Sequence, residues 1–169
     1  MNEQFPLPEL STDKDVAGES FAPIYTTTVT VSGGEAAHGR ASGKARSDDG
    51  VLDIDLRMPA ELGGDGRGTN PEQLLAAGFA ACFHGALSLV ARQEALDPAA
   101  ISIETTVAFG RDPEDGGYLL QVDLVVNWPG IDPDIAAPLL EQAGALCPYA
   151  RMASRGTPTT ITLDSHGRR

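Results

Sequence analysis

Hydrophobic and polar residues alternate along several stretches of the chain, which is the pattern of a strand with one buried face. The clearest case is 51–58, VLDIDLRM, where leucine, isoleucine and methionine occupy every second position and charged residues the positions between them. A β-branched run at 24–34 and two apolar stretches at 100–110 and 118–128 predict three further strands. A last strand is predicted at 157–163, TPTTITL.

A helical pattern replaces the alternation at 71–95. Asn70 is a good N-cap, Pro71 suits the first helical position, and Gln73 completes the spacing of a capping box. Apolar residues cover nearly the whole circumference of the first half, which predicts a helix buried on all sides. Two glycines, a histidine and a serine interrupt the apolar run, so a core helix is favoured over a membrane span.

A second helix is predicted at 132–147, with Asp132 as its N-cap and Pro138 as a source of bending near its start. Pro148 marks a helix end or a kink. The two stretches around the loop RDPEDGG are expected to form a hairpin, and the glycine-studded segment 35–50 leaves room for one short strand. The order β-(β)-β-α-β-β-α-β indicates an α+β fold with antiparallel sheets.

Length and charge narrow the class of protein. A chain of 169 residues with 41% hydrophobic content is consistent with one globular domain, assigned to 23–169, behind a flexible polar arm at 1–22. A net charge of -12 disfavours nucleic acid and anionic membranes as partners. The N-terminus lacks the pattern of a signal peptide, so the expected compartment is the cytoplasm.

Motifs for bound cofactors are absent from the sequence. The chain has no C-x-x-C, no H-E-x-x-H and no G-x-S-x-G, and its three histidines are widely separated. The glycines of LGGDGRG do not form a phosphate-binding loop. We therefore expect neither a metal nor a nucleotide.

Two cysteines carry the candidate chemistry. Cys82 lies in the middle of the apolar helix, where most thiols are inert packing and where burial raises the pKa. A reactive Cys82 needs a nearby cation, which His84 cannot supply because it points about 200° away round the helix. The candidate cations from other segments are Arg40, Lys44, Arg46, Arg151 and Arg155.

Cys147 is either a buried thiol at a helix end or the partner of Cys82 in a reactive pair, which would resolve an oxidised thiol as a disulfide. Glu72 is ten residues before Cys82, which corresponds to ~15 Å along a straight helix. Its simplest interpretation is a carboxylate that favours the helix start. The alternative is that it holds an arginine that reaches the thiol, or acts across a dimer interface.

Three blocks of the sequence resemble a known family. They are SDDGVLDIDLRMP at 47–59, TNPEQLLAAGFAACF at 69–83 and CPYARMASRG at 147–156. Together they are similar to the organic hydroperoxide resistance proteins, within the wider osmotically-inducible-protein family. The resemblance extends over about 24–163 and includes both cysteines.

The resemblance implies a thiol-dependent peroxidase that reduces organic hydroperoxides, including those of fatty acids. It implies an intertwined homodimer with sites near the subunit interface and a long buried central helix that carries the reactive cysteine. No bound cofactor is implied. The reductant is an external dithiol, either dihydrolipoamide or a lipoylated protein.

By position, the resemblance makes Cys82 the peroxidatic cysteine, Cys147 the resolving cysteine, and Glu72 the carboxylate that holds the catalytic arginine. The family places that arginine directly after the glycine pair of the first turn, where this chain has Glu35. Arg40 is nearest to the expected place, with Arg46 as the second candidate. The segment CPYAR also departs from the commoner CPYSN.

Three other functions are compatible with the sequence. A member of the wider family could prefer other peroxides, and a hydrolase could use Cys82 on acyl substrates without a second thiol. A non-enzymatic protein could use the thiols for redox response or bind a ligand without turnover.

Overall fold

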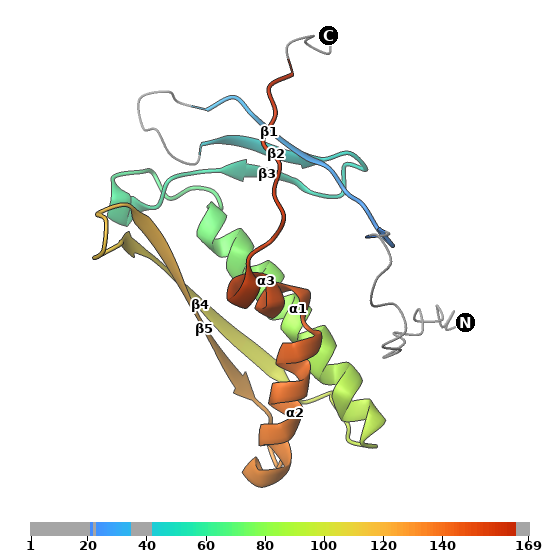
Figure 1. Ribbon diagram of the computed structural model, residues 1–169. Coiled ribbons are helices and arrows are strands. Elements are labelled where there is room, and N and C mark those ends of the chain that lie inside the picture. Colours follow the sequence, from blue (N-terminus) through green and yellow to red (C-terminus); the bar gives the residue numbers. More distant parts are fainter. Residues whose placement is uncertain (1–20, 22, 35–41, 165–169) are drawn as a thin grey trace.

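The computed structural model describes residues 21, 23–34 and 42–164. The arm predicted at 1–22 lies outside these residues, apart from Phe21, and so does Arg40. The described chain is an α+β arrangement of two antiparallel sheets and three α-helices (Figure 1). The predicted α+β class with antiparallel sheets is therefore confirmed, whereas the predicted intertwined homodimer stays a prediction.

The first sheet has three short strands in the order β1-β2-β3, all antiparallel: β1 is Val29–Ser32, β2 is Gly43–Ser47 and β3 is Asp53–Leu56. The strands predicted at 24–34 and 51–58 are both present but shorter, and β2 is the short strand for which the glycine-rich segment left room. Alternation holds along β3, because Leu56 is buried while the two aspartates face outward. Figure 1 shows this sheet above the N-terminal end of α1.

The turn between β2 and β3 is held by the side chain of Ser47, which is only 8% exposed. Its hydroxyl accepts a hydrogen bond from the Leu52 N–H at 3.0 Å and donates one to Asp49 Oδ1 at 2.5 Å. Gly50 closes the turn with a φ of 74°, a conformation that a side chain would strain. The SDDG sequence thus fixes the register in which Arg46 pairs with Asp53.

The second sheet is the predicted hairpin. β4, Ser102–Arg111, and β5, Tyr118–Asn127, pair over their whole length. One face of the hairpin packs against α1, Pro71–Gln93. The start of α1 agrees with its predicted cap, since Asn70 Oδ1 accepts the Gln73 N–H at 2.8 Å.

The helical C-terminal part differs from the prediction at one point. The predicted helix 132–147 is α2, Pro133–Leu146, and a separate short helix, α3, Pro148–Arg155, follows it. The chain leaves the helical conformation at Cys147, with ψ at 116°, because a residue before proline avoids the α region. The sequence indicated this break but not the new helix beyond it.

The strand predicted at 157–163 is wrong for the described chain. This segment has no strand partner among the described residues, and Ile161 and Leu163 are 95% and 91% exposed. Strand-forming side chains alone do not make a strand, because the backbone needs a neighbouring edge for its hydrogen bonds.

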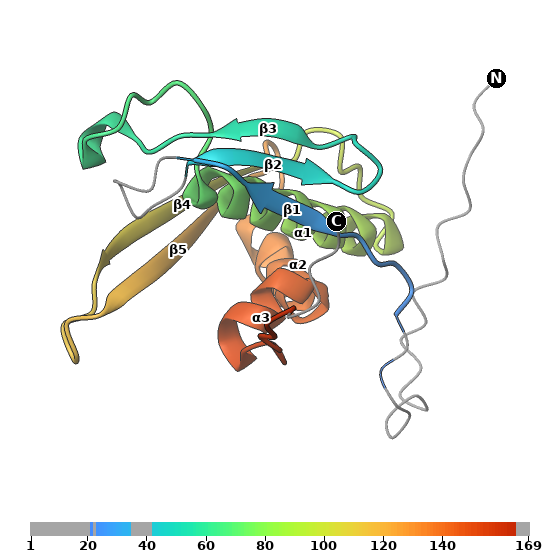
Figure 2. The same cartoon turned by 90° about the horizontal axis from the view of Figure 1, so that it is seen from above.

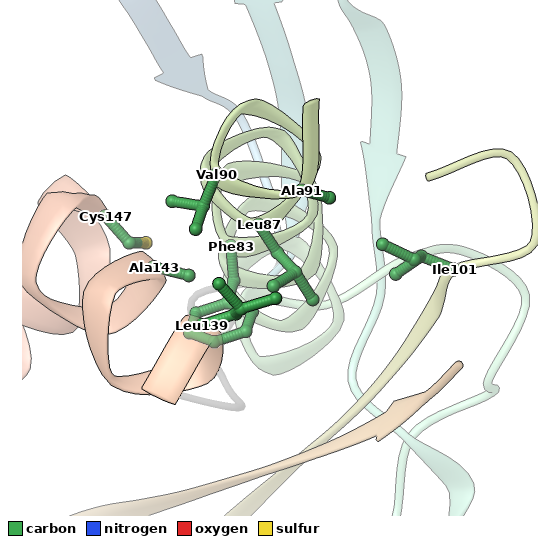
Figure 3. Close-up of a cluster of buried hydrophobic side chains, with 8 residues drawn as sticks. All are labelled: Phe83, Leu87, Val90, Ala91, Ile101, Leu139, Ala143 and Cys147. Atoms are coloured by element: carbon green, nitrogen blue, oxygen red, sulfur yellow. The ribbon is translucent and has the colours of Figure 1, made fainter. Parts of the chain in front are cut away.

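The core lies between α1, α2 and the start of β4 (Figure 3). Its buried side chains are Phe83, Leu87, Val90, Ala91, Ile101, Leu139, Ala143 and Cys147. The α1 helix is long and apolar enough to span a membrane by composition, with a mean hydropathy of 1.9, yet here it is the scaffold for the other elements. The opposite side of α1 is exposed, so the prediction of a helix buried all round is not confirmed by one chain. This exposed stripe consists of Leu74, Ala77, Ala81 and Gly85.

Candidate active site around two cysteines

The two thiols meet where α1, α2 and α3 join. Cys147 Sγ lies 3.3 Å from Cys82 Sγ, although 65 residues separate them in the sequence. Cys147 is fully buried between α2 and α3, and its N–H bonds to the Ala143 carbonyl at 2.8 Å. Cys82 lies in the middle of α1 and is partly exposed. An oxidised Cys82 therefore has a second sulfur already within reach.

Tyr149 brings α3 close to α1. Its ring meets Phe79 edge-on, with 5.7 Å between centroids and 61° between ring planes. It also lies over Gly78, where an added Cβ would be 2.9 Å from the Tyr149 Oη. Sequence reasoning assigned no role in the site to Gly78 or Tyr149. The available signal was a glycine one turn before Cys82, because a mid-helix glycine often marks a close approach.

Burial raises the pKa of the Cys82 thiol, because removal from water disfavours the charged thiolate. The backbone N–H of Tyr149 donates to the sulfur and opposes this effect, whereas Cys147 adds to the rise in pKa. No arginine or lysine of the described residues contributes to the pKa of Cys82. The described residues alone thus keep this thiol protonated at neutral pH.

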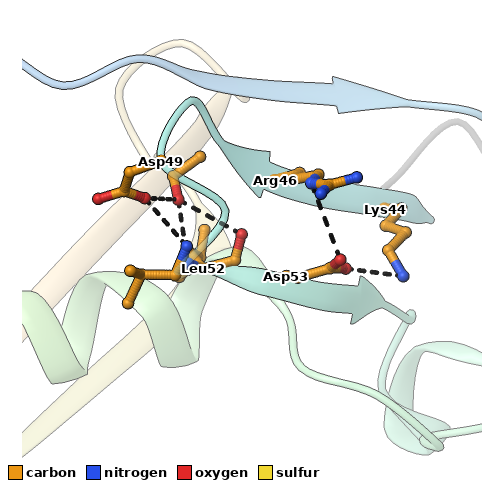
Figure 4. A network of polar contacts seen from close by, with 7 residues as sticks. Lys44, Arg46, Asp49, Leu52 and Asp53 are labelled. Carbon is orange, nitrogen blue, oxygen red and sulfur yellow. Dashed lines mark hydrogen bonds and ion pairs between the residues drawn. The ribbon is translucent and has the colours of Figure 1, made fainter.

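Two of the candidate cations are engaged elsewhere (Figure 4). Lys44 Nζ lies 2.7 Å from Asp53 Oδ1, and Arg46 Nε lies 3.9 Å from Asp53 Oδ2, on the exposed face of the three-stranded sheet. The hydrogen bond from Lys44 holds the pKa of Asp53 below its ordinary value. Arg46, the second candidate for the catalytic arginine, is therefore paired with a surface carboxylate.

The other two candidates, Arg151 and Arg155, lie on α3 and are exposed. Both line a cavity of about 280 Å³ beside the C-terminal half of that helix. Neither has an ion-pair partner among the described residues. Both arginines follow Cys147 closely in the sequence, but they line a separate cavity that does not include either thiol.

Glu72 lies in the first turn of α1, as predicted, and far from Cys82 of its own chain. It lines a cleft of about 420 Å³ between the helix start, the loop after β3 and one face of β4. The apolar wall of this cleft consists of Pro59, Leu62, Ala76, Val107 and Phe109. Sequence reasoning did not identify the cleft, because its walls come from three separate segments.

Metal-ligating side chains do not gather in the part of the chain that the structure describes. No group of three or more histidine, cysteine, aspartate or glutamate side chains could hold an ion there. The site consists of two thiols, an aromatic side chain and a separate carboxylate-lined cleft.

A family model and a sequence relative both identify the same family for this chain. The family model described as OsmC-like protein matches residues 63–162. The organic hydroperoxide resistance protein of Xanthomonas axonopodis pv. citri (strain 306) is 42% identical over 142 residues, which are 83% of this chain and 94% of that protein.

Solved structures agree with the sequence relatives. The organic hydroperoxide resistance protein OhrB of Bacillus subtilis is similar with a TM-score of 0.66 and 44% identity, covering 79% of this chain and 93% of that one. An organic hydroperoxide resistance protein from Legionella pneumophila is similar with a TM-score of 0.69 and 39% identity, covering 80% and 93%. The chain therefore belongs to the OsmC-like protein family, and within it to the organic hydroperoxide resistance proteins.

Proposed function

We propose that this protein is a thiol-dependent peroxidase that reduces alkyl and fatty-acid hydroperoxides to alcohols in the cytoplasm. The observation that carries the proposal is the 3.3 Å approach of a partly exposed thiol, Cys82, to a fully buried one, Cys147. This geometry suits a first sulfur that meets the oxidant and a second that meets only the first. Its relatives are named for resistance to organic hydroperoxides.

The reaction has three steps. The Cys82 thiolate attacks the distal peroxide oxygen, the O–O bond breaks, and the departing alkoxide takes a proton to leave as the alcohol. Cys82 is then a sulfenic acid. The Cys147 thiolate attacks that sulfur, the S–S bond forms, and hydroxide leaves as water after protonation.

An external dithiol restores the enzyme. Dihydrolipoamide, or the lipoyl group of a lipoylated protein, supplies two electrons through two thiol–disulfide exchanges. Because Cys147 is fully buried, the dithiol attacks the sulfur of Cys82 and releases the Cys147 thiolate first. No bound cofactor is required.

Thiolate formation needs a cation that lowers the pKa of Cys82. We assign this role to Arg40, held by Glu72. Arg46 is the weaker candidate because Asp53 already pairs with it. Since Glu72 and Cys82 of one chain are ~15 Å apart along the helix axis, the carboxylate that serves a given thiol belongs to a second copy of the chain.

A homodimer accounts for several exposed apolar surfaces. The stripe of Leu74, Ala77, Ala81 and Gly85 on α1 consists mostly of small residues, so another helix can pack closely against it. The segment 157–163 has the composition of a strand but no strand partner among the described residues. In the dimer the cleft beside Glu72 would approach the other chain's thiol, and its apolar wall would receive the alkyl part of the hydroperoxide.

The test is steady-state consumption of cumene hydroperoxide with dihydrolipoamide, for wild type, Cys82→Ser and Arg40→Ala. We expect rapid turnover in the wild type and loss in both variants. Loss in Cys82→Ser alone would move the cation to another residue. A wild type that consumes one equivalent and then stops would reject the peroxidase in favour of a redox sensor.

A second measurement tests the assembly. Sedimentation equilibrium of the wild type should give a dimer, and introduction of an arginine at Ala81 should weaken it. Mixing inactive Cys82→Ser with inactive Glu72→Gln should restore part of the activity in heterodimers if the site is shared between chains. No recovery, with heterodimers shown to form, would contradict a site in which Glu72 serves the thiol of the other chain.

A further inference from the structure

The helix α3 begins at the thiol pair. Its N-cap is Cys147 and its first residue is Pro148, which has no N–H, so Tyr149 carries the first backbone donor of the helix. The side chain of an N-cap residue ordinarily accepts a hydrogen bond from one of the first donors. Cys147 makes no such bond, and its sulfur lies 3.3 Å from that of Cys82 instead. The start of α3 therefore needs an acceptor from outside its own cap residue.

The sulfur of Cys82 is that acceptor, since the N–H of Tyr149 donates to it. The Tyr149 side chain holds the donor in place, because its ring meets Phe79 edge-on and lies over Gly78. Both contacts are with the turn of α1 that precedes Cys82. Figure 2 shows α3 at the periphery of the molecule, away from the three-stranded sheet. The helices alone thus determine how this donor meets the sulfur.

The free N–H groups at the start of a helix favour negative charge, and cysteines at such positions ionise more readily. The helix that carries Cys82 gives it no such help, because Cys82 lies in the middle of α1, far from either end of the helix dipole. A neutral thiol is a weak acceptor, whereas a thiolate accepts a strong, charge-assisted hydrogen bond. The contact with α3 therefore gains strength as Cys82 loses its proton.

Other groups near Cys82 do not favour its ionisation. Cys147 is the one titratable side chain among the described residues that contributes to the pKa of Cys82, and it raises that pKa. Arg151 and Arg155 lie on the same short helix but line a cavity that includes neither thiol. Within the described part of the chain, the Tyr149 N–H is the one group that lowers the pKa of Cys82.

We propose that the start of α3 is an anion cap for the Cys82 sulfur, in which the N–H of Tyr149 binds the thiolate that attacks the peroxide. The inference rests on the proposed peroxidase, for which it names a catalytic group supplied by the same chain as the thiol. It divides stabilisation of the thiolate between two sources, the backbone of α3 and the arginine proposed above. The Tyr149 ring then acts as the positioning element for its own N–H.

An amide-to-ester change at Tyr149 deletes this N–H and keeps the side chain. Cys147 makes the change accessible, because native chemical ligation at this cysteine joins a recombinant thioester of residues 1–146 to a synthetic peptide of residues 147–169. The control carries its ester at Gly156, whose N–H donates to the Met152 carbonyl at 2.8 Å. Each ester removes one backbone donor of the α3 region, but only the first donor faces the thiol.

Alkylation by iodoacetamide, followed at Cys82 by mass spectrometry, measures the thiolate against pH. In the Tyr149 ester the rate should level off at higher pH than in the ligated wild type. At pH 7 it should be about tenfold slower, as loss of a hydrogen bond to a charged group implies. For cumene hydroperoxide, kcat/KM should fall by a similar factor at pH 7 and recover as pH rises. The Gly156 ester should follow the wild type in both assays.

Amide NMR of the reduced protein gives a second test that needs no altered backbone. The Tyr149 amide proton should shift with pH as Cys82 ionises. The amide proton of Arg151, which donates to the Cys147 carbonyl at 3.0 Å, should not follow this titration. In Cys82→Ala the shift of the Tyr149 amide should disappear, and its hydrogen exchange should become faster because the acceptor is gone.

Two results overturn the inference. One is the same pH profile of alkylation in the Tyr149 and Gly156 esters. The other is a shift of the Tyr149 amide that persists in Cys82→Ala, because it would then report the ionisation of Cys147. Failure of the peroxidase is recognised separately, as absence of cumene hydroperoxide turnover in the wild type. Alkylation and amide titration use no peroxide, so the cap is judged on its own evidence.

Discussion

The middle and the N-terminal end of α1 face different surroundings. In the middle of the helix, Cys82 meets a fully buried partner thiol, and Tyr149 lies so close over Gly78 that an added Cβ would be 2.9 Å from the Tyr149 Oη. At the N-terminal end, Glu72 lines an open cleft of about 420 Å³, and the nearby Leu62 is 45% exposed. One chain therefore completes the dithiol half of the proposed site and leaves the other half open.

The difference separates two properties that a thiol peroxidase needs. Disulfide formation depends on how close two sulfurs are held, and the three helices of one chain determine that distance. Thiolate formation depends on charge, and the described residues raise the pKa of Cys82 instead of lowering it. Changes at the helical junction and changes at the open end should thus affect different steps.

The largest effect is expected from Cys147→Ser. This variant should consume one equivalent of organic hydroperoxide and stop at the Cys82 sulfenic acid without forming the intramolecular disulfide, because the second sulfur is gone. Cys82→Ser should consume none. Mass spectrometry after one equivalent, with a sulfenic-acid probe, measures both. Normal dihydrolipoamide-dependent turnover in Cys147→Ser would show that the 3.3 Å approach has no catalytic role.

The next effect concerns charge. In the double variant Arg40→Ala/Cys147→Ser, the rate at which iodoacetamide alkylates Cys82 should rise with pH. It should level off only above the ordinary thiol pKa of about 8.5, because burial raises the pKa of Cys82. The alkylation rate of the single variant Cys147→Ser, which keeps Arg40, should level off at lower pH, since a cation favours the thiolate. Coincident profiles would remove Arg40 from the site.

Two glycines of α1 provide a matched pair. A methyl group at Gly78 would press on the Tyr149 ring, whereas nothing lies within 4 Å of a methyl group at Gly85. Gly85→Ala should therefore gain up to about 1 kcal/mol in unfolding free energy from helix propensity. In Gly78→Ala the same gain is offset by overpacking of roughly 1–3 kcal/mol. Urea unfolding compares the two stabilities.

Disulfide formation should separate the same pair of variants. Gly78→Ala displaces Tyr149 and with it the start of α3, so closure of the Cys82–Cys147 disulfide after one equivalent of peroxide should slow several-fold. Gly85→Ala should close at the wild-type rate. If Gly85→Ala instead loses stability with dilution, Gly85 lies in the dimer interface proposed above.

The sequence predicted those features that depend on neighbours along the chain. Asn70 and Pro71 located the start of α1, and alternation at 51–58 located β3, which a tight turn joins to its partner β2. The strand predicted at 157–163 failed because pairing needs a distant edge, which composition does not report.

The candidate site was predictable to the same extent. Cys82 and Cys147 were identified as a possible pair, but no local pattern places residues 65 positions apart at 3.3 Å; the pairing came from the family resemblance. Gly78 and Tyr149, which create the contact, have no distinctive periodicity. The position of Arg40 lies outside the described residues.

The smallest effect is expected from a change in the three-stranded sheet, which lies above the N-terminal end of α1. Ser47→Ala removes the acceptor for the Leu52 N–H and the hydroxyl that donates to Asp49, which should cost about 1 kcal/mol in unfolding free energy at pH 7. The hydrogen bond from Ser47 lowers the pKa of Asp49, so its contribution is present above the unfolded pKa and is lost as pH falls through the folded one. The difference in unfolding free energy between wild type and variant should therefore shrink in urea titrations at pH 3.

Disulfide closure in Ser47→Ala should be unchanged, since the described β1–β3 sheet makes no extensive packing contact with α1, α2 or α3. A slower closure in Ser47→Ala would mean that the two halves of the site are coupled within one chain, and that the open end transmits its structure to the thiols.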